Sequence, residues 1–164
     1  MSKPALIAFM GLPRSGKSTL ATELAAKLGA PIVCKDTIRL ALHGQRYAVA
    51  AEEMVRVFSK IMIKSLFLRG HKIVICDETN YSKAARKALS DPDWDILWFP
   101  VQTPADICCE RAIATNQPDL VPVINEMNAR YEPLEDSDRL WKGYRKNPGD
   151  CECDRCGNFH VKGA

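Results

Sequence analysis

The chain has 164 residues, of which 46% are hydrophobic and 26% charged, an ordinary composition for one globular domain. That amount of apolar material supports a single core and excludes collagen-like, coiled-coil and wholly disordered chains. The formal net charge of +3 is too small to indicate a nucleic-acid-binding protein by itself, although it excludes none. No apolar run approaches the roughly 20 residues of a membrane helix, and the first residues do not resemble a secretory signal. We therefore expect a cytoplasmic protein with no membrane partner.

Short apolar runs alternate with segments of helical periodicity, and this alternation predicts a parallel α/β sheet. In chain order we expect a strand at 5–10, a helix at 17–28, a strand at 31–34, helices at 36–43 and 52–68, a strand at 73–76, a helix at 82–89, a strand at 94–101, and helices at 107–114 and 122–131. The apolar residues expected on one face of the longest helix are Val55, Phe58, Ile61, Met62 and Leu66. Thr103 is expected to cap the helix at 107–114, with Pro104 at its first position.

The segment between the first strand and the first helix matches the phosphate-binding pattern G-x-x-x-x-G-K-[ST] at every specified position. Its residues are Gly11, Leu12, Pro13, Arg14, Ser15, Gly16, Lys17 and Ser18, followed by Thr19. The glycines let successive backbone N–H groups point at phosphate oxygens, and the start of the helix adds its dipole. Lys17 is expected to reach the β- and γ-phosphates, and the Ser18 hydroxyl to ligate Mg²⁺. The segment therefore predicts binding of a nucleoside triphosphate.

Two further acidic residues follow predicted strands, where the carboxyl edge of a parallel sheet faces the ligand. Asp36 follows the second strand and has Arg39 one helical turn away; it either accepts a proton from an attacking hydroxyl or merely caps its helix. Asp77 follows the third strand and either lies near the Mg²⁺ or is an ordinary turn residue. Both alternatives stay open on these residues alone.

The segments that carry a resemblance to a known family are the phosphate loop, Asp36-x-x-Arg39 and Asp77-x-Thr79-Asn80. At these spacings they resemble the kinase domain of polynucleotide 5′-hydroxyl kinases and the related small zeta-toxin-like P-loop kinases, over most of the chain. The resemblance implies a P-loop NTPase fold of the nucleoside-monophosphate-kinase kind: a three-layer α/β sandwich with a short parallel sheet and a helical lid. It also implies that Asp36 is the general base, that Arg39 contacts an acceptor phosphate, and that Arg111 in the lid stabilises the transition state.

The chain departs from the family pattern in its lid, because residues 113–117 contain no second arginine. Either Arg14 or Arg130 replaces that arginine, or the transfer is slow. The basic substrate channel of the family is also weak here. Four basic residues either line such a channel or form an ordinary solvated helix face, namely Arg46, Arg56, Lys60 and Lys64.

The seven cysteines fall into two groups. Four lie in apolar segments, where free cysteine behaves as a small buried hydrophobe: Cys34, Cys76, Cys108 and Cys109. The other three lie near the chain end with a histidine, in the spacing of a zinc knuckle: Cys151, Cys153, Cys156 and His160. This group either binds a structural Zn²⁺, or is a reactive tail, or is a partial site completed by another chain.

These observations predict a P-loop kinase domain at 1–133 and a C-terminal extension at 134–164. We expect an ATP- and Mg²⁺-dependent kinase that transfers the γ-phosphoryl group to a hydroxyl, with the 5′-hydroxyl of a nucleic acid favoured as acceptor. The nearest alternative is a kinase of the same fold that acts on a hydroxymethylated base, a nucleoside or another small alcohol. The alternative of another class is an ATP-binding switch that phosphorylates nothing.

Overall fold

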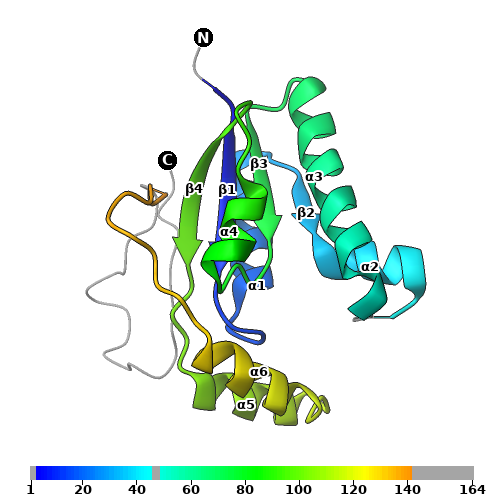
Figure 1. The fold of residues 1–164 in the computed structure, drawn as a ribbon, viewed down its shortest axis with the longest axis vertical. Helices are drawn as coiled ribbons and strands as arrows, with labels where there is room; N and C mark the ends of the chain where they lie inside the picture. The colour runs from blue at the N-terminus through cyan, green and yellow to red at the C-terminus, as the bar shows by residue number, and fades with distance from the viewer. Residues whose placement is uncertain (1–2, 46–48, 142–164) are drawn as a thin grey trace.

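Strands and helices alternate along the chain in the order that the sequence predicted (Figure 1). The computed structural model describes residues 3–45 and 49–141. Its elements are β1 (Ala5–Met10), α1 (Lys17–Leu28), β2 (Ile32–Cys34), α2 (Lys35–His43), the 3₁₀ turn η1 (Val49–Ala51), α3 (Glu52–Leu68), β3 (Ile73–Asp77), α4 (Lys83–Leu89), β4 (Asp95–Pro100), α5 (Ala105–Ala114) and α6 (Leu120–Ala129). The bounds of β1, α1 and α3 equal those predicted from the apolar pattern.

The four strands form one sheet in the order β2-β3-β1-β4, and every neighbouring pair is parallel. Parallel strands end at the same edge of a sheet, so the segments that follow β1, β2 and β3 meet there. These segments are the phosphate loop, the start of α2 and the turn after Asp77. The sheet therefore gathers the predicted site residues at one edge.

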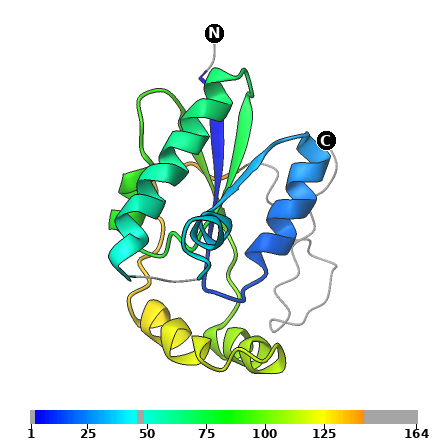
Figure 2. The same cartoon turned by 90° about the vertical axis from the view of Figure 1, so that its right-hand side faces the viewer.

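Helices cover both faces of the sheet, which gives the three layers that the sequence predicted (Figures 1 and 2). On one face α1 packs through Ala21 and Leu24 against Ile7, Phe9 and other strand residues. On the opposite face α3 and α4 pack against the alternate strand residues, together with Trp94 and Trp98: Leu6, Ala8, Val33, Val74 and Cys76. The alternation along β1 assigns odd and even positions to opposite layers.

Helices α5 and α6 lie beyond the carboxyl ends of the strands and form the predicted helical lid (Figure 2). They enclose a small apolar cluster of their own, in which Cys108, Ala112 and Ile124 surround Leu12 of the phosphate loop. Because Leu12 is 4% exposed, the lid and the loop share one buried contact. Within the described residues, no helix has both the length and the apolarity needed to cross a membrane.

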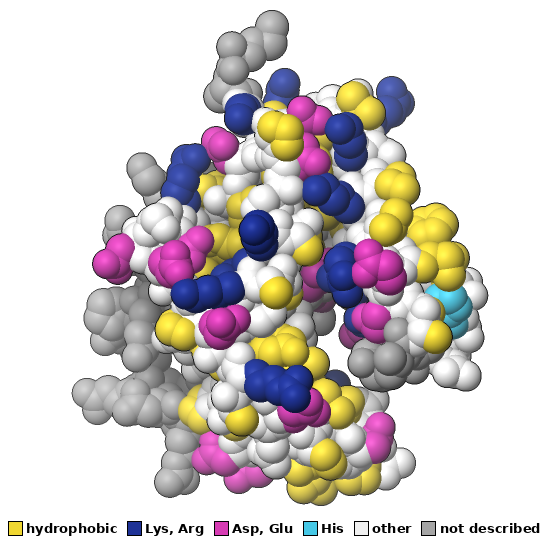
Figure 3. All heavy atoms as spheres, viewed as in Figure 1, with side chains coloured by type: hydrophobic (Ala, Val, Ile, Leu, Met, Phe, Trp, Pro, Cys, Tyr) yellow, Lys and Arg dark blue, Asp and Glu magenta, His cyan; other side chains and the backbone are white. Residues whose placement is uncertain are grey.

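The apolar face predicted for α3 coincides only in part with its buried face: Val55 and Leu66 pack in the core, but Phe58, Ile61 and Met62 are exposed. The buried residues are Val55, Ser59 and Ile63, which recur every four positions. Phe58 is 41% exposed and Ile61 is 54% exposed, and hydrophobic side chains gather on this side of the molecule over α2 and α3 (Figure 3). The reason is Ser59, whose hydroxyl donates a 2.9 Å hydrogen bond to the buried Oε1 of Glu78 and so places a polar residue inside the buried stripe.

The predicted N-cap of α5 is also wrong. Pro104 is the N-cap residue and makes no side-chain capping bond, and the helix begins at Ala105. The Thr103 hydroxyl instead donates to the backbone oxygen of Ser15 at 2.8 Å. Among the described cysteines Cys76 and Cys108 are buried, whereas Cys34 and Cys109 are only partly buried, and all four are free thiols.

Residues 139–141 lie beside β4. The backbone N–H of Trp98 donates to the oxygen of Arg139 at 2.8 Å, and Trp141 returns a bond to Trp98 at 3.0 Å. Leu140 thereby forms a parallel bridge with Trp98. The division of the chain at residue 133 stays a prediction, and the cysteine and histidine residues at 151–160 lie outside the described residues.

Candidate active site

The phosphate loop is fixed by two glycines with positive φ. Gly11 has φ 152°, and a Cβ there would lie 2.6 Å from the backbone oxygen of Val101, so a side chain is excluded. Its N–H donates to the oxygen of Thr79 at 2.9 Å, which joins the loop to the end of β3. Gly16 has φ 99° and is the N-cap residue of α1. The loop therefore leads directly into the amino end of a helix, where backbone N–H groups can hold phosphate oxygens.

Lys17 lies at the first position of α1 with only 7% of its surface exposed. Its ammonium donates to the backbone oxygen of Leu12 at 2.5 Å and to the Ser15 hydroxyl at 3.3 Å. Burial lowers the pKa of Lys17 to about 8, and the negative charge of Asp77 opposes that shift. A buried ammonium gains strongly from an anionic ligand, because the negative charge of the ligand compensates for the hydration that burial removes.

Ser18 and Asp77 meet at the same edge. The Ser18 hydroxyl donates a hydrogen bond to the Asp77 carboxylate, and burial raises the pKa of Asp77 in spite of that bond and of the nearby Lys17. Both side chains offer hard oxygen ligands of the kind that Mg²⁺ takes, and Mg²⁺ usually completes its shell with water and substrate phosphates. Within residues 3–45 and 49–141 no group of three or more His, Cys, Asp or Glu residues could hold a metal ion. The Ser18 and Asp77 oxygens therefore fit Mg²⁺ bound together with a phosphate ligand.

Asp36 lies in the first turn of α2 and its side chain is 68% exposed. The N-cap residue of this helix is Cys34, so Asp36 is not the cap. Its Oδ1 accepts a hydrogen bond from Nη1 of Arg39 at 2.5 Å. The arrangement leaves a carboxylate open to solvent at the carboxyl edge of β2, beside the phosphate loop.

Arg39 is held on its other side by Glu52, the first residue of α3. Nε and Nη2 of Arg39 donate to Oε1 and Oε2 of Glu52, both at 2.7 Å. This paired hydrogen bond raises the pKa of Arg39 and lowers that of Glu52. Glu52 is not among the residues predicted from the sequence, because its partner is 13 residues away and only the packing of α2 on α3 brings them together.

A second carboxylate from outside the predicted set lies next to the same helix. Nζ of Lys35 lies 2.6 Å from Oε2 of Glu78, whose side chain is 4% exposed. The hydroxyl of Ser59 donates to the other oxygen of Glu78. Glu78 directly follows Asp77, so the one available sequence signal was the second acid after a strand.

The lid contacts the phosphate loop through Arg111 and Arg14. Nη1 of Arg111 donates to the backbone oxygens of Arg14 and Ser15, both at 3.3 Å. Nη2 of Arg14 in turn donates to the hydroxyl of Thr115, just after α5. These contacts bring the predicted lid arginine to the loop that would hold the transferring phosphates.

Other predicted residues have partners elsewhere. Arg130 pairs with Glu126 at the exposed end of α6. The described members of the suggested basic channel each pair with a carboxylate at the protein surface: Arg56 with Glu53, Lys60 with Asp91, and Lys64 with Asp93. Arg46 and the proposed zinc ligands Cys151, Cys153, Cys156 and His160 lie outside the described residues.

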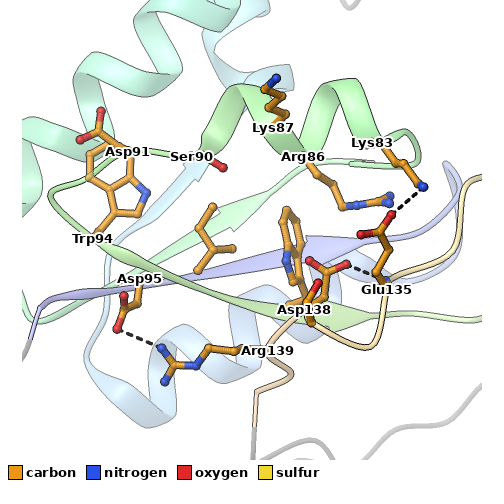
Figure 4. Close-up of a pocket in the computed structure, with 13 residues that line it drawn as sticks. Lys83, Arg86, Lys87, Ser90, Asp91, Trp94, Asp95, Glu135, Asp138 and Arg139 are labelled. Atoms are coloured by element: carbon orange, nitrogen blue, oxygen red, sulfur yellow. Dashed lines mark hydrogen bonds and ion pairs between the residues drawn. The ribbon is translucent and has the colours of Figure 1, made fainter.

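A separate hollow of about 470 Å³ lies between α4, β4 and the segment at 135–139 (Figure 4). Trp94 and Trp98 line it together with charged side chains, several of which pair with one another, as Lys83 does with Glu135 and Arg139 with Asp95. No residue of the phosphate loop or of α2 lines it. The chemistry of the phosphate loop therefore places the candidate site at the carboxyl edge of the sheet and not in this hollow.

Solved structures of P-loop kinases share the fold. A chain of the Pnkp1/Rnl/Hen1 RNA repair complex superposes with a TM-score of 0.61 at 16% identity, and the match covers 80% of this chain and 47% of that chain. A gluconokinase from Sinorhizobium meliloti 1021 gives 0.58 at 19% identity over 85% and 82% of the two chains. The APS kinase CysC of Mycobacterium tuberculosis, in complex with AMPPNP and APS, gives 0.62 at 19% identity over 82% and 86%. The present chain thus spans about half the length of the Pnkp1-complex chain, and identities this low concern the fold alone.

A family model described as chromatin associated protein KTI12 matches residues 4–142. The match includes the phosphate loop, the turn after β3 and the helical lid. No curated protein sequence matches this chain.

Proposed function

The chain belongs to the family described as chromatin associated protein KTI12, and we propose that it is a kinase that transfers the γ-phosphoryl group of ATP to a hydroxyl group. One observation carries the proposal. An exposed carboxylate, Asp36, follows β2 at the sheet edge where the phosphate loop and the Ser18–Asp77 pair also lie. A nucleotide-binding protein without phosphotransfer needs no such carboxylate.

On the donor side, the backbone N–H groups of Gly16, Lys17 and Ser18 at the amino end of α1 would hold the phosphates, and the Lys17 ammonium would bind the β- and γ-phosphate oxygens. Ser18 and Asp77 would hold Mg²⁺, which when bound supplies positive charge to the phosphate oxygens. The buried position of Lys17 supports this role, because its charge is poorly solvated without an anionic partner. Arg111 would add positive charge from the lid as negative charge develops on the transferring group.

On the acceptor side, Asp36 would take the proton of the acceptor hydroxyl as its oxygen attacks the γ-phosphorus. The bond between that phosphorus and the β–γ bridging oxygen breaks, and ADP leaves. General base catalysis of this kind contributes about 10²–10⁴-fold to a rate. Arg39 positions Asp36 through its Nη1 hydrogen bond.

Two kinds of acceptor are supported by different observations. The resemblance to polynucleotide 5′-hydroxyl kinases, and the structural likeness to a chain of an RNA repair complex, favour a nucleic-acid end. The likeness to a gluconokinase over more than four-fifths of both chains favours a small alcohol. The acceptor is therefore proposed here only as a hydroxyl compound.

A transfer assay tests the proposal. Protein with γ-labelled ATP and Mg²⁺ is offered 5′-hydroxyl DNA and RNA oligonucleotides, DNA with a hydroxymethylated base, nucleosides and small alcohols. We expect label on at least one acceptor, and a loss of at least about 100-fold in Asp36→Asn with unchanged ATP affinity. Glu53→Gln is the matched control, since Glu53 is an exposed acid that pairs with Arg56 on α3. ATP turnover without a labelled acceptor, equal in wild type and Asp36→Asn, would contradict the kinase and favour a switch.

The cysteine-rich end remains a separate proposal. Cys151, Cys153, Cys156 and His160 have the residue types and spacing of a structural zinc site in an extension at 134–164. Metal analysis of the full chain is expected to give one zinc per chain, lost in Cys153→Ser. A metal-free chain in which Cys151, Cys153 and Cys156 all react with a thiol reagent would contradict it.

A further inference from the structure

We propose that the acceptor carries no phosphate or other anionic group next to its reacting hydroxyl. The inference rests on the proposed kinase function and names the substrate class of that same site. Two cations, Lys35 and Arg39, flank Asp36 on α2 and are the groups that would bind such an anion. Carboxylates of this chain already neutralise both of them, and these carboxylates make the site selective for uncharged alcohols.

The Nε–Nη2 edge of Arg39, which could bind an anion, is hydrogen-bonded to Glu52. A guanidinium holds a phosphate or carboxylate best through two parallel N–H bonds, and Nε with Nη2 forms one such edge. Glu52 occupies this edge with two bonds of 2.7 Å. Asp36 occupies Nη1. Three of the five guanidinium N–H groups are therefore already bonded to two carboxylates, which neutralise the charge that would attract an incoming phosphate.

Lys35 likewise forms an ion pair with a carboxylate of this chain, Glu78. The Lys35–Glu78 distance is 2.6 Å and the Glu78 side chain is 4% exposed. Its second oxygen is held by the Ser59 hydroxyl on α3. A carboxylate this deeply buried cannot turn to water, and taking Lys35 away would leave it as an unpaired buried charge. Lys35 therefore stays with Glu78 when an acceptor binds.

The five charged side chains of this paired cluster carry a net charge of −1. In the part of the chain that the structure describes, Asp36, Glu52 and Glu78 supply three negative charges to this cluster, against two positive charges from Lys35 and Arg39. An acceptor phosphate would lie beside the exposed Asp36 without a free cation from this cluster, and like charges at short range repel. An uncharged hydroxyl compound meets no such repulsion and can donate a hydrogen bond to Asp36. A nucleic-acid end, whose 5′-hydroxyl has a phosphate on the same sugar, is thus the poorer acceptor.

Matched pairs of acceptors test the inference: thymidine with thymidine 3′-monophosphate, and glycerol with glycerol 3-phosphate. Within each pair a reacting hydroxyl is retained and one neighbouring phosphate is added. We expect kcat/KM for the uncharged member to exceed that for its phosphorylated partner at least tenfold, a difference of about 1.4 kcal/mol. Preference for the phosphorylated member would overturn the inference while leaving the kinase proposal intact. No transfer to any member, with ATP hydrolysis equal in wild type and Asp36→Asn, would contradict the kinase proposal itself.

The Glu52→Gln variant tests whether Glu52 causes the preference for uncharged acceptors. This variant keeps the shape of the side chain but removes the charge that neutralises Arg39, so the ratio of kcat/KM values should shift at least tenfold toward the phosphorylated acceptor. Glu53→Gln changes the neighbouring acid, which pairs with Arg56, and should leave that ratio as in wild type. A merely structural role of Glu52 would lower both rates together, so an unchanged ratio in Glu52→Gln would overturn the assignment.

Discussion

The buried ammonium of Lys17 should make ATP affinity depend on pH in a range where ordinary lysines stay charged. Burial lowers the pKa of Lys17 from 10.5 to about 8. A shift of this size corresponds to roughly 3 kcal/mol, at about 1.4 kcal/mol per pKa unit. Bound triphosphate raises the pKa again by placing negative charge beside the ammonium. ATP binding above pH 8 should therefore take up a proton, and the Kd should rise by up to about tenfold per pH unit above pH 8.

Calorimetric titration with ATP at pH 8.5, in two buffers of different ionisation enthalpy, measures this proton. With a pKa of about 8, most of the free protein is neutral at Lys17 at pH 8.5, so about three-quarters of a proton should be taken up per ATP. Lys17→Arg keeps its charge throughout and should take up none, which also controls for any titration of the nucleotide. Equal proton uptake in wild type and Lys17→Arg, or a Kd unchanged between pH 7 and 9.5, would contradict a lowered pKa at Lys17.

The same pKa fixes the sign of a stability effect. The unfolded chain holds the Lys17 proton more tightly than the native chain, so the contribution of Lys17 to the free energy of unfolding should rise with pH between about 8 and 10.5. Asp77→Asn should raise the Mg²⁺ concentration for half-maximal transfer at least tenfold, and an unchanged Mg²⁺ titration would show that Asp77 does not bind the ion. As the pH is lowered, the Mg²⁺ affinity of the wild type should begin to fall at a higher pH than for an ordinary aspartate, because burial raises the pKa of Asp77. In urea denaturation, Ser59→Ala should lower the free energy of unfolding by about 1–3 kcal/mol, because it leaves a buried oxygen of Glu78 without its donor. Ser65→Ala on the exposed side of the same helix should lower it by less than about 0.5 kcal/mol, and equal losses in the two variants would contradict a stabilising Ser59–Glu78 bond. In the same assay, Leu12→Ala should lower the free energy of unfolding by about 2–4 kcal/mol, because Leu12 fills the apolar cluster between the phosphate loop and the lid. A loss below about 1 kcal/mol would show that this cluster does not hold the loop and the lid together.

The helices and strands that were predicted with the correct bounds are those whose residues follow a local sequence pattern. The apolar run of β1, the four-residue repeat of α1 and the phosphate loop between them depend on neighbours in sequence, so their bounds follow from periodicity and glycine placement. The parallel order of the sheet then accounts for Asp36 and Asp77 lying at one edge. The confirmed parts of the prediction are therefore the fold and the resemblance to P-loop kinases.

The errors and omissions all involve contacts between residues distant in sequence. Thr103 was assigned to its own helix, but its hydroxyl bonds to Ser15, 88 residues away. The buried side of α3 was misassigned because Ser59 is buried to satisfy Glu78, 19 residues away, and no hydrophobic period contains that information. Glu52 was missed for the same reason, since only the packing of α2 against α3 brings it to Arg39.

The central claim is that the γ-phosphoryl group goes to an acceptor and not to water. The most direct test follows γ-labelled ATP in a single turnover, with and without the acceptor panel, and compares label on the acceptor with label released as inorganic phosphate. We expect that acceptor addition diverts most of the label and that Asp36→Asn abolishes this diversion while ATP still binds. Release of the label as phosphate at one rate, whatever acceptor is present and whatever residue stands at position 36, would contradict it.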